Sequence, residues 1–143
     1  MAVVARIAAV FFAYVLACIA GAIVFTLGLL AWQWNEFAWL ASPGHLAAFE
    51  IAITAVIFAV IALPPAALVI ALGEGFALRS SLFYAVIGGA LALAAAFGLN
   101  MADYVDASAA PAARVREVLA ATGIAGGLVY WLVAGRRAGM WHR

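Results

Sequence analysis

Residues 7–30 of this 143-residue chain read IAAVFFAYVLACIAGAIVFTLGLL and contain no charged side chain. A helix of about 20 such residues is long enough to cross the roughly 30 Å hydrocarbon layer of a membrane. Lipid offers backbone groups no hydrogen-bond partner, so a spanning segment must be a helix or a strand of a closed barrel. Because residues 7–30 lack the alternating polarity of barrel strands, the stretch predicts a transmembrane helix.

The rest of the chain is of similar composition. Hydrophobic residues make up 71% of the sequence and charged residues 9%, against roughly 45–50% and 25% in an average soluble domain. So few charges cannot coat a compact body in water, which excludes a soluble globule. Intrinsic disorder requires low hydrophobicity and high net charge, and it is excluded as well. We expect the lipid bilayer to surround most of the protein.

Four intervals between charged side chains are long enough to span a membrane. We predict a single domain with transmembrane helices over about 7–31, 46–72, 80–100 and 114–135. The remaining segments are a Trp-rich interfacial segment at 32–45, an acidic outer loop at 101–113 and a basic tail at 136–143. The short link between the second and third helices makes them an antiparallel hairpin. The predicted fold is an all-α integral membrane protein with four transmembrane helices in an antiparallel up-down bundle.

The distribution of arginine indicates how the chain is threaded. Lys and Arg in short loops stay on the cytoplasmic side, and all seven cations here are Arg. With both termini in the cytoplasm, five arginines lie inside and two lie outside. The inner set is Arg6, Arg79, Arg136, Arg137 and Arg143, and the outer set is Arg114 and Arg116. Arg136, Arg137 and Arg143 form the expected cytoplasmic anchor. Exclusive use of Arg reflects coding bias and favours a bacterial cytoplasmic (inner) membrane.

Small residues recur at helical spacing in three of the predicted helices. In lipid, helices associate largely through close backbone contact, which small side chains permit. We predict that helix packing uses Ala9, Ala13, Ala17 and Gly21 in the first helix, Gly88, Ala92 and Ala96 in the third, and Gly123 and Gly127 in the fourth.

The second predicted helix carries three candidate functional residues, Glu50, Pro64 and Pro65. Two adjacent prolines remove two backbone donors and predict a kink or local unwinding near Leu63. An ionisable group within a span is a functional candidate by default, and Glu50, about one turn inside the helix, is the nearest case. In a structural role the kink serves packing and Glu50 forms an ion pair. In a transporter the prolines are a hinge and Glu50 couples or selects the solute.

Patterns for catalysis, metal binding and cofactors are weak. Cys18 has no histidine in its neighbourhood to act as a base, and two histidines at one depth, as haem needs, are absent. The predicted outer side gathers residue types found in metal sites, without diagnostic spacing. These residues are Glu36, His45, Glu50, Asp103 and Asp106. We expect no catalytic residue, no metal, no cofactor and no nucleic-acid partner.

Two functions from different classes remain, and a third is weaker. The leading hypothesis is a non-catalytic accessory, assembly or structural subunit that packs against other membrane proteins through its small-residue faces. The alternative is a small-solute or ion transporter or channel that forms its path as a homo-oligomer, using Glu50 and the Pro64-Pro65 kink. The third is a lipid-modifying enzyme with Glu50, His45 and Asp103 as its candidate residues.

Overall fold

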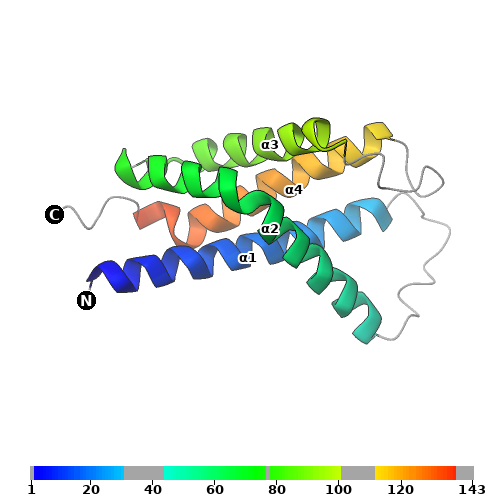
Figure 1. The fold of residues 1–143 in the computed structure, drawn as a ribbon, viewed down its shortest axis with the longest axis horizontal. Coiled ribbons are helices and arrows are strands. Elements are labelled where there is room, and N and C mark those ends of the chain that lie inside the picture. The colour runs from blue at the N-terminus through cyan, green and yellow to red at the C-terminus, as the bar shows by residue number, and fades with distance from the viewer. Residues whose placement is uncertain (1, 31–43, 77, 101–111, 138–143) are drawn as a thin grey trace.

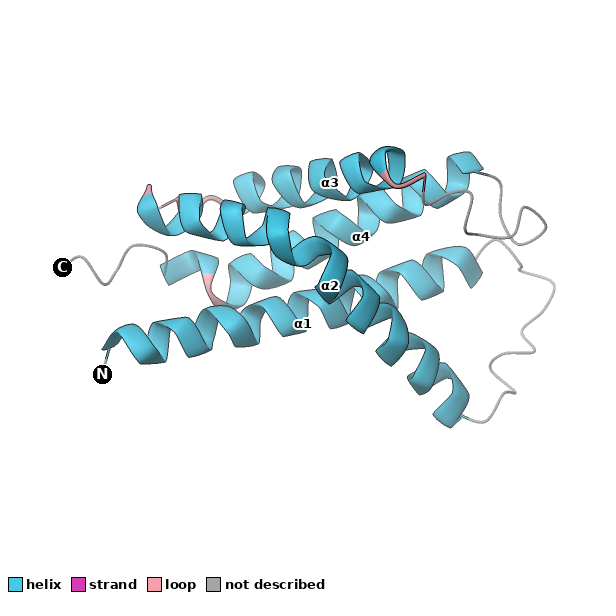
Figure 2. Ribbon diagram, in the orientation of Figure 1, coloured by secondary structure: helices cyan, strands magenta, loops and turns pink. Residues whose placement is uncertain are grey.

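The computed structural model describes residues 2–30, 44–76, 78–100 and 112–137. Within these ranges the chain forms four long helices, a short 3-10 helix and no strand (Figure 2). They are α1 (Ala2–Leu30), α2 (Gly44–Gly75), α3 (Ser81–Gly98), α4 (Ala112–Val133) and η3 (Gly135–Arg137). Each of the four long helices is sufficiently long and apolar to cross a membrane. The predicted four-helix membrane fold is therefore confirmed.

The helix ends differ from those expected. The sequence predicts a first helix starting at residue 7, but α1 begins at Ala2 and includes Arg6. Likewise α2 runs from Gly44 to Gly75, beyond both expected ends. The prediction stopped the first helix at Arg6 and the second before Glu74, whereas a helix continues through the headgroup layer, where long charged side chains reach polar surroundings.

Parts of the expected interfacial and tail segments lie outside the described residues. Residues 31–43 of the Trp-rich segment, 101–111 of the acidic loop and 138–143 of the basic tail belong to this group. The last residues of the Trp-rich segment begin α2, and the last residues of the loop begin α4.

Helix α4 lies between α1 and α3 and is antiparallel to both (Figure 1). On the α1 side, Ala13 clusters with Tyr130, and a Cβ built on Gly21 would lie 3.2 Å from the Thr122 methyl carbon. Residues further along α1 therefore contact residues earlier in α4, as expected for an antiparallel pair. The first residues of α1 and the 3-10 helix η3 consequently lie at the same end of the bundle.

The contact between α3 and α4 is made by glycines. A Cβ built on Gly123 would overlap the Gly88 carbonyl and lie 2.6 Å from the Ala92 Cβ, and a Cβ on Gly127 would overlap the Tyr84 carbonyl. One turn further along, Ala96 is 2% exposed and packs in a cluster with residues of α4. The small residues predicted to serve packing in the third and fourth helices thus lie against one another.

Helix α2 is the least integrated of the four. It remains helical through Pro64 and Pro65 but changes direction near its middle, so the expected kink occurs without unwinding (Figure 1). Its amino-terminal half diverges from the other helices, while its carboxyl-terminal half packs Ile70 against the cluster that contains Tyr84. From residue 48 to residue 75, the buried residues are Ala55 and Gly73 alone.

Candidate functional site

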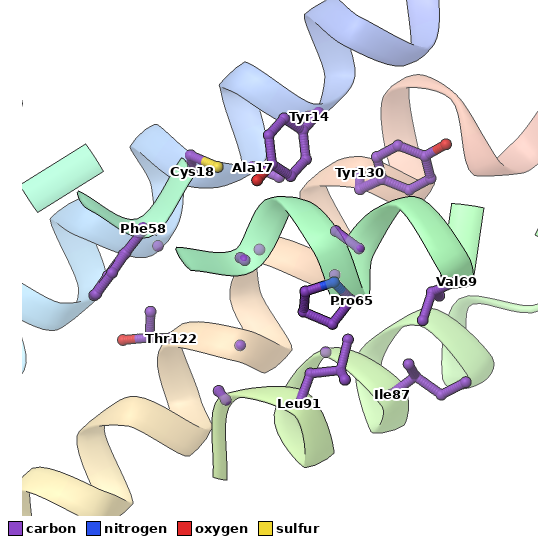
Figure 3. A pocket seen from close by; sticks show the side chains of 18 of the residues that line it. Tyr14, Ala17, Cys18, Phe58, Pro65, Val69, Ile87, Leu91, Thr122 and Tyr130 are labelled. Atoms are coloured by element: carbon purple, nitrogen blue, oxygen red, sulfur yellow. The ribbon is translucent and has the colours of Figure 1, made fainter. Parts of the chain in front are cut away.

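A cavity of about 200 Å³ lies where α2 bends over the other three helices (Figure 3). Its walls are mainly apolar side chains from all four helices. They include Phe58, Pro65 and Val69 of α2, Ile87 and Leu91 of α3, and Ala17 of α1. Engineered apolar cavities of about 150 Å³ stay dry and bind molecules such as benzene. The space is therefore large enough for a small apolar compound or a length of hydrocarbon chain.

The cavity lies between a bent helix and helices rich in small residues. Gly21 of α1, Gly88 of α3 and Gly126 of α4 are among its lining residues, and their lack of a side chain lets the helices lie close together. On the opposite side, Pro64 and Pro65 deny the helix two backbone hydrogen bonds, and α2 bends where those bonds are missing. The packing glycines and the proline kink, predicted separately from the sequence, thus bound one space.

Five side chains with a polar group border the cavity, namely Tyr14, Cys18, Tyr84, Thr122 and Tyr130. The Tyr14 hydroxyl donates a hydrogen bond to the Ala59 carbonyl at 2.7 Å, which ties α1 to α2 just before the bend. Cys18 is a buried free thiol. Thr122 is 6% exposed, and its Oγ1 has no hydrogen-bond partner among the described residues. Buried hydroxyls are normally hydrogen-bonded, so the unpaired Thr122 Oγ1 is an exception to that rule.

Of the three candidate residues on α2, the structure brings one to the cavity. Pro65 is half-buried and lines it, whereas Pro64 is exposed on the outer face of the helix. Glu50 is exposed in the diverging half of α2 and does not line the cavity. Thr122 and Tyr14 were missed because neither carries charge nor breaks a helix, the two signals used to select candidates.

The residues expected to resemble a metal site are largely outside the described part of the chain. Glu36, Asp103 and Asp106 lie in undescribed segments, and the His45 side chain is not described although its backbone belongs to α2. Among the described residues, no group of three or more His, Cys, Asp and Glu side chains is close enough to hold a metal ion.

A second polar cluster lies at the end of the bundle where α1 begins. The Arg6 guanidinium forms an ion pair with the Glu74 carboxylate and donates to the Ala134 carbonyl at 3.0 Å. The two charged side chains are 17% and 16% exposed, so water screens the pair only in part. Arg6 thereby joins the start of α1 to the end of α2 and to the end of α4.

The described arginines separate between the two ends of the bundle. Arg6 lies at the end that also holds Arg79, whose carbonyl accepts a hydrogen bond from Trp131 Nε1 at 2.6 Å. Arg114 and Arg116 lie in the first turns of α4, at the opposite end. This separation agrees with the grouping from which the threading was predicted.

Four apolar spans around a common cavity define this chain as a four-span integral membrane protein. In comparisons with known proteins, no family model, no curated protein and no solved structure matches it.

Proposed function

We propose that this protein is a non-catalytic accessory, assembly or structural subunit that binds another membrane protein through α2. The observation that carries the proposal is the poor burial of α2 within its own bundle. From residue 48 to residue 75 only Ala55 and Gly73 are buried, whereas α4 buries residues along most of its length. Because so little of the α2 surface is buried by the other three helices, most of it is available for contact with another membrane protein.

The small-residue faces first considered for docking are used inside the chain. Gly88 and Gly123 lie against one another, and Gly21 lies against Thr122. A partner must therefore use another surface. In α2, a stripe of alanines offers one: Ala55 is buried and Ala59 half-buried at the bundle, while Ala48 and Ala52 continue the stripe along the diverging half and are exposed. Small residues on an exposed helix face permit close helix contact in lipid.

The proposal includes a location and an orientation. The end that carries Arg6, Arg79 and Arg136 faces the cytoplasm, because short loops retain their positive charges there. Both termini are then cytoplasmic. The exclusive use of Arg among the cations supports a bacterial inner membrane.

The first experiment is extraction from the native membrane in a mild detergent, followed by measurement of the native mass and identification of bound chains. A stoichiometric larger partner is the expected result. Ala52→Phe should release that partner, because it places a large side chain on the exposed stripe of α2. Ala94→Phe, at an exposed position of α3, is the matched control and should retain it. A partner that both variants retain would contradict the α2 interface.

The alternative is an oligomeric transporter or channel for a small solute or ion. It is supported by Pro65, which lines the cavity at the bend of α2. Glu50 lies away from the cavity in a single chain, so a coupling role would require a second copy to complete the path. Reconstituted protein carrying Glu50→Gln tests this directly. Loss of a measured flux would favour transport, and a homodimer without a larger partner would point the same way. An assembly subunit should tolerate the substitution.

A further inference from the structure

We propose that the end of the bundle where α3 begins and α4 ends binds one anionic phospholipid (Figure 1). The lipid phosphate would bind the Arg136 guanidinium, and an acyl chain would lie along the outward face of the α3–α4 contact. This site uses neither the cavity nor the α2 surface assigned to a protein partner, so it can be tested independently of that proposal. It requires only that this end of the bundle reaches the headgroup layer, whichever side of the membrane it faces.

The described charges at this end are unbalanced. Arg6, Arg79 and Arg136 supply three positive charges. Glu74 is the acidic side chain described there, and its carboxylate is bound to Arg6. Arg136 is exposed and forms no ion pair among the described residues. Each arginine near a membrane surface favours anionic over uncharged surroundings by a factor of about five, so this end selects an anionic headgroup.

The opposite end of the bundle differs in charge. The charged side chains described there are two of each sign, namely Arg114, Arg116, Glu117 and Glu50. Excess positive charge is therefore a property of one end of the described structure. Only that end is expected to attract an anionic lipid.

Trp131 holds the cationic group in position. Its indole Nε1 donates to the Arg79 carbonyl at 2.6 Å, which ties the end of α4 to the segment before α3. The Arg136 guanidinium lies over the Trp131 ring, 5.8 Å from its centroid. An arginine stacked on a ring keeps the N–H groups along its edge, and a guanidinium binds a phosphate through two such groups. Tryptophan at headgroup depth is typical of membrane proteins.

An apolar surface leads from this cation toward the bilayer centre. On α4, Ile124 and Leu128 precede Trp131 at helical spacing, so the three side chains share one face. A Cβ built on Gly89 of α3 would lie 2.9 Å from Ile124 Cγ1, and Val86 lies three residues before Gly89 on the same side of α3. None of these residues lines the cavity. The exposed side chains of this surface are Leu82, Val86, Ile124 and Leu128.

The test uses the full-length protein in a mild detergent and dioleoyl phosphatidylglycerol as the probe, with lipid retention measured by native mass spectrometry. Phosphatidylcholine with the same chains is the reference. The expected result is one retained phosphatidylglycerol, preferred at least about fivefold over phosphatidylcholine. Arg136→Gln, at an exposed position, should lower phosphatidylglycerol binding about fivefold and leave phosphatidylcholine binding unchanged. Equal retention of the two lipids by the wild type would overturn the site.

Arg116→Gln is the matched control. It removes an arginine that also lies over a ring, that of Phe97 at 4.9 Å, but at the end where the described charges balance. This variant should bind phosphatidylglycerol as the wild type does, and an equal loss in both variants would overturn the location.

Two further measurements test the lipid itself. Excess inorganic phosphate should not displace phosphatidylglycerol, because it makes no contact with the apolar surface, and displacement would show a site for soluble anions instead. Phosphatidylglycerol with a diazirine in one acyl chain should label peptides of α3 and α4. Labelling confined to α1 and α2 would overturn the path assigned to the chain.

Discussion

Gly123→Ala puts a methyl group on α4 where that helix touches α3. The new Cβ would lie 2.6 Å from the Ala92 Cβ and closer still to the Gly88 carbonyl oxygen, whereas ordinary contacts lie at 3.4–4 Å. Neither neighbour has a flexible end that can swing away, because one is backbone and the other is a methyl group. The two helices must therefore move apart along their closest contact.

The expected cost combines two opposing effects. Overpacking of this kind costs about 1–3 kcal/mol, and a clash with backbone favours the upper end of that range. Alanine gains about 0.5–1 kcal/mol over glycine within a helix. We expect a net loss of about 2 kcal/mol in the free energy of unfolding, or about a 30-fold fall in the folding equilibrium constant. Titration of detergent-solubilised protein with dodecyl sulfate, followed by tryptophan fluorescence, measures it.

Gly98→Ala is the matched control in α3. A Cβ at Gly98 meets no atom within 4 Å, so this variant should be neutral or stabilised by less than about 1 kcal/mol. Gly88→Ala combined with Gly123→Ala should cost less than the sum of the two single changes, since both open the same contact. Equal stability of Gly123→Ala and Gly98→Ala would refute direct glycine contact between α3 and α4.

Two further substitutions test the polar contacts. Glu74→Gln should lower the free energy of unfolding by about 1–3 kcal/mol, because it leaves the partly buried Arg6 charge without its carboxylate. Glu117→Gln, in an exposed ion pair, should change it by less than about 0.5 kcal/mol in the same unfolding titration, and equal effects would contradict the burial difference. Tyr14→Phe should cost about 1 kcal/mol and speed amide hydrogen exchange around the α2 bend, because the bond to the Ala59 carbonyl is lost. Unchanged exchange would show that this bond does not hold the bend.

The spans could be predicted because every segment that crosses the lipid must satisfy its backbone hydrogen bonds internally. An uncharged run such as residues 7–30 has no folded alternative in a bilayer, so its helical state follows from composition. The glycines of α3 and α4 could also be read from the sequence, since residues four apart share a helix face. The pairing of helix faces was not predicted, because small residues indicate that a face can pack closely but do not indicate which helix it contacts.

The polar contacts and the cavity depend on long-range arrangement. Arg6 and Glu74 are 68 residues apart, so no local spacing indicates their pairing. The cavity requires Pro65 of one helix to lie over the glycines of the three others, and neither feature alone implies a space. Thr122 was overlooked for a related reason: a threonine in a membrane helix normally bonds its own backbone, and only the folded structure shows that this one does not.

The central position of α4 has a consequence for how the protein is made. Of the four helices, α4 leaves the ribosome last, yet it is the helix against which both α1 and α3 pack. Chain growth of about 5–20 residues per second separates the completion of α3 from that of α4 by a time on the order of seconds. Throughout that interval the Ala13 and Gly88 faces contact lipid or the insertion machinery. Biogenesis therefore passes through a three-helix stage that exposes two contact-competent surfaces, and this is the stage at which a chaperone or a wrong neighbour has its opportunity to bind.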